Sequence, residues 1–444
     1  MENNLTHSDM ISDLPDALLT HILSFMNPKE AVQTCILSKR WRTTWASMPV
    51  LRFDYGKFVP LAIEAIHEGN LVKFVKFVRE MLQNRESLLL DTFEFWLPNR
   101  HDFFSADLFS AECILLALKF KPRVFSVRAS MQVILSCTDP IPNIFTCASL
   151  QSISLHDTSF CHAGDKFLQL RAVNLPHLKL FKLFMGRVND HFFKILFSGC
   201  PGLEELELRF CHLHVSLASS EILKSLVLKH CDFKKKLVIS TPNLVHLDID
   251  NENYDAVNIS LQNMASLVNA RIQCSDMHVN DTLRSSNCGL TLHNHSSKFC
   301  MSDHTLESSY TKKGTEKDAS NCSDFYTLKS LLLGCSNLSN LFKSINFFLH
   351  KSPNLKKLCL EVFPEHHKKT CEEEWRNARL SYEECVDALR KGGRIEVVLI
   401  TESLFMMEER ITKLIQALNE LANSTRRIRA FVFVRITSSY HCLR

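Results

Sequence analysis

The sequence predicts an α/β fold in which a small N-terminal three-helix module precedes a repeat solenoid with a parallel β-sheet on its concave face. Two observations predict this fold. A phrase of leucines recurs from residue 148 onward, and the first fifty residues carry clear helix start and stop signals. The chain has 444 residues, 45% of them hydrophobic and 23% charged, which is typical of a globular protein with more than one domain.

The first fifty residues contain three short helical patterns. Pro15 can open a first helix, and apolar residues then recur at three- and four-residue steps on one broad face: Leu18, Leu19, Ile22, Leu23 and Met26. Asn27 followed by Pro28 predicts the cap of a second helix. Ser38 offers a third cap, ahead of Trp41 and Trp45 at helical spacing, and Pro49 ends the segment.

A module of this size cannot hide all of its apolar side chains, because three short helices cover too little of their own surface. Part of the apolar face is therefore expected to meet a partner. Two of the four tryptophans lie here beside arginines, and both residue types are over-represented in interface hot spots.

These residues resemble an F-box of the plant type. The resemblance rests on Leu14-Pro15-Asp16, Leu18-Leu19, Ile22-Leu23, Ala31-Val32, the run from Leu37 to Arg42, and Trp45. It implies docking onto a Skp-type linker protein that joins the chain to a cullin-RING scaffold in a ubiquitin ligase, with no chemistry performed by the F-box protein itself. By position, the resemblance implies these linker-contacting residues: Leu14, Pro15, Leu18, Ile22, Leu23, Val32, Cys35, Leu37, Ser38, Trp41 and Trp45.

An alternative interpretation is that the segment is the capped end of a larger helical domain whose tryptophans are simply core residues. The ordered series of matching residues favours the F-box. One departure is mild: Met26 and Asn27 stand where many F-boxes have Leu-Pro or Leu-Ser, and Met fills gaps well.

The middle of the chain repeats the spacing L-x-x-L-x-L. The phrases begin at Leu150, Leu178, Leu203, Leu223, Leu244, Leu267, Leu328 and Leu355. The intervals fit a leucine-rich repeat except for the long one between Leu267 and Leu328. The phrases at Leu203 and Leu223 extend to the fuller pattern that includes Cys211 and Cys231.

Stacking of successive repeats is the simplest way to bury the leucines of this pattern. Alternation places the leucines on one side of each strand and polar residues on the other, so neighbouring repeats close a continuous core beside a parallel sheet. Cys211 and Cys231 are then expected to turn inward as small hydrophobic side chains that donate weakly to backbone carbonyls.

These patterns divide the chain into segments. We expect a flexible tail at 1–11, the F-box at 12–50, divergent early repeats at 51–147 and leucine-rich repeats at 148–272 and 326–363. The early repeats include strands from Leu88 and Arg123 and a helix from Val72 to Met81. Residues 273–325 predict a polar mobile insert, and 364–444 predict a helix plus a βαβ phrase (strand 395–400, helix 408–422, strand 428–436) that extends or caps the sheet.

Several functional classes are disfavoured. The net charge of +4 is too small for a general nucleic-acid binder, and 11 glycines leave little room for phosphate-binding loops. In the insert, Cys274, Cys288, Cys300 and Cys322 with His278, His293, His295 and His304 lack the close spacing of a zinc site, so we expect no metal and no cofactor.

The chain start lacks a secretory signal, and no apolar run is long enough for a membrane span. The odd number of cysteines, 17, then predicts reduced thiols in the nucleus or cytoplasm.

The sequence therefore predicts a non-catalytic substrate receptor whose repeats bind an unknown target protein. A leucine-rich scaffold without a ubiquitin-ligase role is the alternative, and an enzyme is disfavoured because no catalytic motif is present. The expected target surface is the outward set of strand residues: Ser152, Ser154, His156, Lys182, Phe184, Glu205, Glu207, Arg209, Ser225, Val227, Lys229, His246, Asp248 and Asp250.

Overall fold

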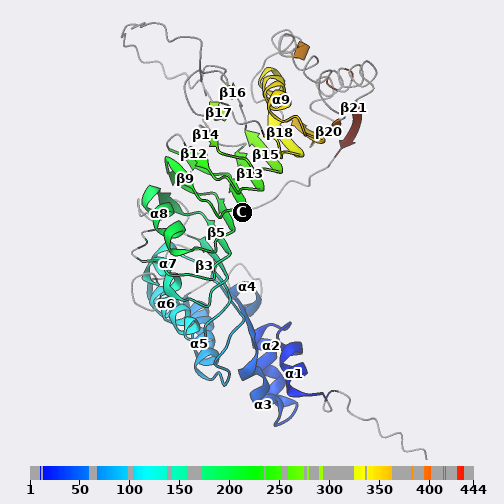
Figure 1. Cartoon of the computed structure of the whole chain (residues 1–444). Helices are drawn as coiled ribbons and strands as arrows, with labels where there is room; N and C mark the ends of the chain where they lie inside the picture. The colour runs from blue at the N-terminus through cyan, green and yellow to red at the C-terminus, as the bar shows by residue number, and fades with distance from the viewer. Residues whose placement is uncertain are drawn as a thin grey trace, which may run out of the picture. The chain divides into compact units, whose positions relative to one another are not determined.

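The computed structural model describes residues 11, 14–59, 68–98, 104–137, 143–158, 168, 170, 172–234, 237–251, 259–274, 278–279, 290–293, 325–335, 338–362, 382–383, 395–401, 414, 416 and 428–434. The chain divides into two compact units. Figure 1 labels their helices and strands. Unit 1 comprises residues 1–187 with 191–203, and unit 2 comprises residues 188–190 with 204–444.

Unit 1 begins with the predicted short helices. They are α1 (Asp16–Leu23), α2 (Pro28–Gln33), η1 (Thr34–Ile36), α3 (Trp41–Thr44) and η2 (Trp45–Ser47). The Asn27 cap is confirmed, since its side chain accepts a hydrogen bond from the Lys29 N–H at 3.0 Å.

The predicted Ser38 cap is wrong. Helix α3 begins at Trp41, and its N-cap residue is Arg40, whose backbone is already helical. The Arg40 side chain instead reaches back to α1, where it pairs with Asp16 at 2.6 Å and donates to the Leu14 carbonyl. Because α3 starts at Trp41, it begins later than a helix capped by Ser38 would.

The strands of unit 1 are parallel and follow one another in chain order. They are β1 (Val50–Asp54), β2 (Thr92–Trp96), β3 (Val124–Ala129), β4 (Ser152–Asp157) and β5 (Leu180–Phe184). The early segment is thus built as repeats. The strand predicted from Leu88 starts only at Thr92, and β1 follows the F-box helices directly, a strand that the sequence patterns did not reveal.

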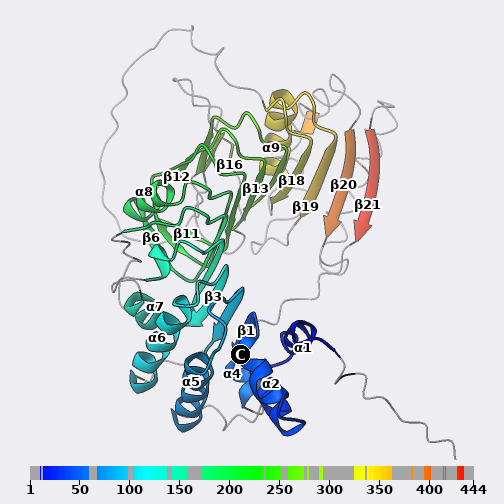
Figure 2. The same cartoon turned by 60° about the horizontal axis from the view of Figure 1, so that its bottom comes forward.

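Three helices lie along one side of these strands: α5 (Glu68–Gln83), α6 (Phe104–Leu118) and α7 (Met131–Ser136) (Figure 2). Unit 1 also contains α4 (Tyr55–Phe58), η4 (Ile144–Thr146) and most of α8 (Asp190–Gly199). The helix predicted over 72–81 is confirmed within α5. Its Phe74 ring stacks on Phe95 of β2 with centroids 5.9 Å apart, which joins helix and strand in one core.

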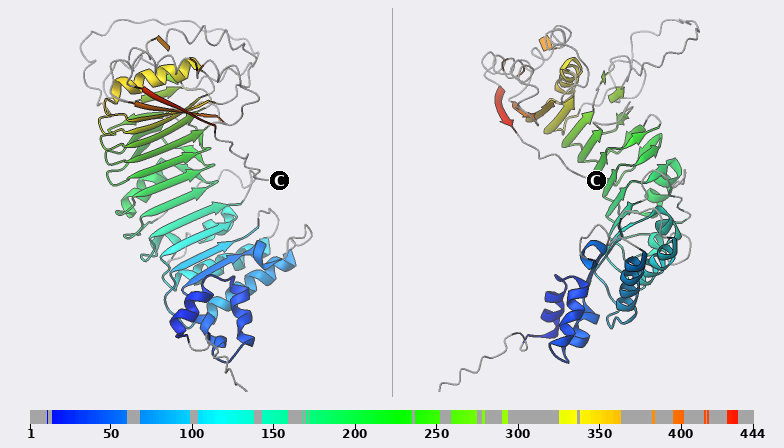
Figure 3. Two further views of the ribbon diagram at one scale, coloured as in Figure 1. Left: turned by 90° about the vertical axis from the view of Figure 1, so that its right-hand side faces the viewer. Right: turned by 180° about the vertical axis from the view of Figure 1, so that it is seen from behind.

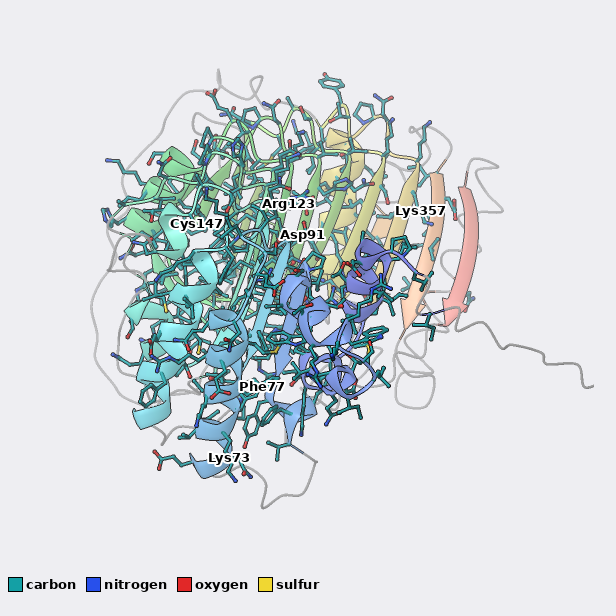
Figure 4. The ribbon with its side chains drawn as sticks, turned by 90° about the horizontal axis from the view of Figure 1, so that it is seen from below. Lys73, Phe77, Asp91, Arg123, Cys147 and Lys357 are labelled. Atoms are coloured by element: carbon teal, nitrogen blue, oxygen red, sulfur yellow. The ribbon has the colours of Figure 1, made fainter. Side chains whose placement is uncertain are left out.

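Polar contacts fix the starts of neighbouring strands in unit 1. Arg123 donates to Asp91 at 3.1 Å and to the Gln151 side chain at 3.2 Å. These three residues directly precede β3, β2 and β4, so one guanidinium links the starts of three neighbouring strands. The labelled Asp91 and Arg123 lie next to each other in Figure 4.

Unit 2 continues the same architecture. Its main strands are parallel and in register: β7 (Glu205–Arg209), β10 (Ser225–Lys229), β13 (His246–Asn251), β15 (Asn269–Cys274), β18 (Ser330–Cys335), β19 (Lys357–Val362), β20 (Ile395–Thr401) and β21 (Ile428–Val434). They run side by side as the green to red arrows of Figure 3. Leu206, Leu226 and Leu247 occupy one register position and are buried, as the repeat pattern predicts.

The return segments of unit 2 are mostly short strands rather than helices. They include β8 (His212–His214) with β11 (Asp232–Phe233), and β9 (Leu217–Ser219) with β12 (Leu237–Ser240) and β14 (Ile259–Gln262). The helix α9 (Leu338–Lys351) precedes β19, and β6 (Arg187–Asn189) lies where the two units meet in sequence.

Two predicted segments are described only in part. Within the expected insert, β16 (His278–Val279) and β17 (Leu290–His293) pair antiparallel, and β17 pairs with β14. The rest of the insert and nearly all of the predicted helix 408–422 lie outside the described residues. Since β20 and β21 are parallel neighbours, the C-terminal phrase extends the sheet.

Each turn after β7 and β10 has the same unusual geometry. Phe210 and His230 have left-handed backbones, with φ of 53° and 51°. The following thiols turn inward as predicted: Cys211 donates to the Arg209 carbonyl at 3.3 Å and Cys231 to the Leu208 carbonyl at 3.4 Å. Burial raises the pKa of the Cys231 thiol, which disfavours a reactive thiolate.

Leu226→Ala tests the repeat core. Leu226 is buried between Leu206 and Leu247, so its truncation is expected to lower the free energy of unfolding of the chain by about 2–5 kcal/mol. Leu217→Ala, at an exposed leucine of the same unit, is the control and is expected to change it by less than about 1 kcal/mol. Urea denaturation measures both, and equal losses would contradict the proposed packing.

Candidate partner-binding surfaces

The apolar face predicted for the first helix is split into two stripes. Leu19 and Leu23 are buried inside unit 1, while Leu18 and Ile22, each one position earlier in the sequence, are exposed. Phe25, just beyond the end of α1, continues the exposed stripe. The first helix therefore packs inward with one row of leucines and presents a second apolar row to solvent.

A second exposed apolar pair follows α2. Ile36 ends η1 with 88% of its surface exposed, and Leu37 beside it is also exposed. Phe25 and Ile36 were not among the predicted contact residues. Phe25 could have been predicted, because it follows Ile22 by three residues and so falls on the same side of the helix. Nothing in the sequence distinguished Ile36 from a buried isoleucine.

The two tryptophans of the F-box helices are less exposed than these apolar residues. Trp41 is only 8% exposed and belongs to the core of the F-box helices, while Trp45 is half-buried. The predicted linker-contacting residues therefore fall into three groups. Pro15, Leu18, Ile22, Leu37 and Ser38 are exposed; Leu14, Val32, Cys35 and Trp45 are half-buried; Leu23 and Trp41 are buried.

The F-box helices are tied to the first repeats by Arg85. Its guanidinium donates to the Met48 carbonyl at 2.8 Å and to the Leu89 carbonyl at 2.9 Å, and it lies over the Phe120 ring at 5.2 Å. Burial lowers the pKa of Arg85 to about 10, which still leaves it charged at neutral pH. The exposed apolar surface is therefore carried on a module that is fixed to its neighbours within unit 1.

In unit 1, the predicted target residues lie on two adjacent strands. Ser152, Ser154 and His156 on β4 stand in register with residues of β5, where Ser154 faces Lys182 and His156 faces Phe184. The His156 and Phe184 rings stack with centroids 5.0 Å apart. Burial and the nearby Arg128 charge lower the pKa of His156 to about 4, so this histidine is neutral at physiological pH.

In unit 2, the remaining predicted residues form three register rows across β7, β10 and β13. The rows are Glu205, Ser225, His246; Glu207, Val227, Asp248; and Arg209, Lys229, Asp250. We call this side of the unit 2 strands, opposite the buried leucines, the polar strand face.

Two residues of the polar strand face are more buried than the others. Glu207 and Asp250 lie on the predicted side of their strands but are buried; Glu207 pairs with Arg209, and Asp250 lies 3.8 Å from Arg271. The rows also continue beyond the predicted set to Arg271 and Gln273 of β15 and Glu361 of β19. The signal was present, since these residues hold the same positions in the phrases that begin at Leu267 and Leu355.

The described residues contain no group of His, Cys, Asp and Glu side chains arranged to hold a metal ion. The cysteines and histidines of the insert lie at positions where no side chain is described. No helix in the described part of the chain is long and apolar enough to cross a bilayer.

Lowering the pH is expected to destabilise the chain through His156. Because its folded pKa of about 4 lies below the ordinary value of 6.5, the unfolded chain binds this proton first, and the stability contributed by neutral His156 is lost as the pH falls from 6.5 to 4. Denaturation over this pH range should show a smaller loss in His156→Gln than in wild type. NMR titration of the ring should give a midpoint near 4, and a midpoint near 6.5 would contradict the burial of the ring.

The chain matches known families in both of its parts. Residues 11–53 match the F-box domain model, and residues 127–281 match the model of the leucine-rich repeats of an FBD-associated F-box protein, At5g56370. The putative F-box/LRR-repeat protein At3g59170 of Arabidopsis thaliana is 31% identical over 303 residues, which cover 60% of this chain and 61% of that protein. The aligned part thus spans less than two thirds of that relative.

Two further Arabidopsis thaliana relatives are aligned over more of their own length. The putative F-box protein At1g58310 is 28% identical over 79% of this chain and 73% of its own length. The F-box/LRR-repeat protein At3g58900 is 31% identical over 60% of this chain and 79% of its own length. With the helical module and the parallel repeat strands described above, these matches show that the chain belongs to the plant family of F-box/leucine-rich-repeat proteins.

Proposed function

We propose that this protein is a non-catalytic substrate receptor of an SCF-type ubiquitin ligase, acting in the nucleus or cytoplasm. Its F-box docks on a Skp-type linker protein that connects it to a cullin-RING scaffold, and its repeats bind a target protein. The observation that carries the proposal is the exposed apolar surface on the F-box helices, formed by Leu18, Ile22, Phe25, Ile36 and Leu37.

This surface has the character of an interface. Burying a leucine or isoleucine side chain is worth about 1.5–3 kcal/mol, and several exposed apolar side chains on one small module are unfavourable unless a partner covers them. The buried Leu19, Leu23 and Trp41 hold the helices that present it. In this proposal the exposed apolar row contacts the linker, and the buried row holds the F-box helices in place.

The repeats supply the second surface. A bound target would be held near the ubiquitin-charged enzyme, which replaces a bimolecular encounter with an intramolecular one and raises the effective concentration of its lysines. The polar strand face carries mixed charge and half-buried apolar residues, a composition that suits a protein partner.

The triple variant Leu18→Ala, Ile22→Ala, Leu37→Ala tests linker docking. Each truncation removes exposed apolar contact area, so the affinity for a purified Skp-type linker is expected to fall by about 100-fold or more, given about 1–2 kcal/mol for each contact. The thermal unfolding midpoint should stay near that of wild type, because all three side chains are exposed. Calorimetric titration measures the affinity.

A matched control uses exposed leucines outside the F-box. Leu88→Ala with Leu89→Ala removes two apolar side chains from the loop before β2, and this variant should bind the linker as wild type does. Trp41→Ala is not a suitable probe, because Trp41 is buried and its loss would damage the module itself. Equal linker affinity in the triple variant and in wild type would refute docking through this surface.

Proximity labelling in plant cells tests the receptor role against a scaffold without a ligase role. Proteins labelled by the wild-type fusion are expected to include some that accumulate when the proteasome is inhibited. The triple variant should label the same proteins without that dependence on the inhibitor, because it retains the repeats but cannot join the ligase. A scaffold would give the same labelled set, with no effect of the inhibitor, for both fusions.

A further inference from the structure

A carboxylate cluster lies on the polar strand face of unit 2. We define it as Asp248, Asp250 and Glu361, which converge on the guanidinium of Arg271 at N···O distances of 3.8, 3.8 and 3.9 Å. These distances are too long for hydrogen bonds, so Arg271 contributes charge to the three carboxylates but does not hydrogen-bond to them; a second cation beside the cluster is Lys229, which pairs with Asp248. Arg271 itself donates to the Gln273 side chain at 2.5 Å, and Gln273 donates to Glu361.

The two aspartates keep oxygens that have no hydrogen-bond partner. Oδ1 of Asp248 and Oδ1 of Asp250 are both shielded from solvent and accept no hydrogen bond, although Oδ1 of Asp248 lies 3.8 Å from Nε of Arg271. Asp250 is only 8% exposed, and the contact of its other oxygen with Arg271 directs the side chain into the cluster. A buried carboxylate oxygen without a donor is unfavourable, and proteins rarely retain one without a ligand, an ion or a functional use.

A cationic ligand fits this arrangement better than a metal ion does. None of the acidic, histidine or cysteine groups in the described part of the chain has the arrangement of a metal site. An arginine side chain instead brings five N–H donors and a positive charge in one plane. Nucleic acid is disfavoured, because phosphates would meet carboxylates of the same charge.

The cluster is open to an incoming side chain. The Asp248 side chain keeps 26% of its surface exposed and the Arg271 side chain 37%, so the cluster borders solvent. Asp248 also pairs with Lys229 at 2.8 Å through its Oδ2, which leaves its Oδ1 without a hydrogen-bond donor. Approach from solvent with a small side-chain rearrangement would bring donors to the two Oδ1 atoms.

Neighbouring residues suit the stem of a long basic side chain. Val227 and Leu332 are half-buried and lie in the same register row as Asp248 and Arg271, where they offer apolar surface to methylene groups. Phe210 is 43% exposed and stacks on His230 with centroids 4.8 Å apart. The N–H groups of Phe210 and His230 donate to the carbonyls of Lys229 and Asp250, which fixes this aromatic pair to the strands of the cluster.

We propose that the polar strand face of unit 2 binds a basic peptide segment of the target protein, with an arginine or lysine side chain placed against the carboxylate cluster. This inference rests on the proposed function, because it names the chemistry of the target that the receptor recognises. In this proposal the negative charge of the carboxylate cluster recognises the target, rather than a general fit along the whole length of the repeats.

The test uses the full chain in complex with its Skp-type linker and a fluorescent peptide of four Gly-Arg repeats as the probe. Fluorescence anisotropy should show that this peptide binds at least tenfold more tightly than the same peptide with citrulline, which keeps the shape but removes the charge. The affinity should fall as the salt concentration rises. Equal binding of the arginine and citrulline peptides, or tighter binding of a glutamate peptide, would overturn the proposal.

The decisive variant is Asp248→Asn with Asp250→Asn, which removes two charges with little change in volume. It is expected to weaken binding of the arginine peptide at least tenfold. The control, Glu204→Gln with Asp232→Asn, removes two charges from unit 2 outside the cluster, at residues paired with Lys224 and Lys234, and should bind as wild type does. Wild-type affinity in the cluster variant refutes the proposal.

A second variant covers the case in which the double substitution disturbs folding. Val227→Arg retains every carboxylate and adds a cation on the face, so it should compete with the peptide and weaken its binding at least tenfold. Unchanged binding in this variant also overturns the proposal.

The proposed function is tested separately, and the peptide measurement is repeated on the full chain purified without its linker. The F-box triple variant, purified without linker, should bind the arginine peptide as wild type does. Failure of wild type to bind the linker would therefore refute the receptor function alone, whereas loss of the preference for arginine would refute only the basic-peptide inference.

Discussion

The structure depends on the register of leucines between successive parallel strands. In unit 2, Leu206, Leu226 and Leu247 occupy one position on adjacent strands, and Leu208, Leu228 and Ile249 occupy the next inward position. A slip of one residue would exchange these side chains with Glu207, Val227 and Asp248 and place charge in the core. The same alternation that buries the leucines therefore fixes which polar residues share the polar strand face.

The sequence predicted the repeats well because their signal is local and periodic. Every L-x-x-L-x-L phrase became a strand of a parallel sheet, since spacing alone decides which side chains can be buried together. The return segments were less predictable. Their short strands, such as β9 and β12, are stabilised by pairing with each other, and such pairing between distant segments leaves little pattern in either one.

The F-box was also identified from its sequence, but the exposure of its residues was not. A helix of eight residues with apolar side chains on most of its surface has no obvious inner side until the neighbouring helices are placed. Leu18 and Leu19 are adjacent in sequence, yet one is exposed and the other buried. Trp41 looked like an interface residue by its type, while the packing of α1 against α3 made it part of the core. The carboxylate cluster was missed for a similar reason, because Arg271 and Glu361 are 90 residues apart and meet only through the sheet register.

The direct passage from η2 into β1 gives the F-box a second role as an end cap. Ser47 ends the last turn of the helical module and Val50 begins the first strand, and Met48 between them is buried. Helix α2 packs on β1, and Arg52 of β1 donates to the Ser24 carbonyl, so the F-box helices lie against the outer edge of the sheet in unit 1. Solenoids need such caps, because an open edge invites strand addition and aggregation. Removing the first fifty residues is therefore expected to uncover the edge of β1 and to promote aggregation of the repeats, so that the F-box helices contribute to the solubility of the strands that follow them.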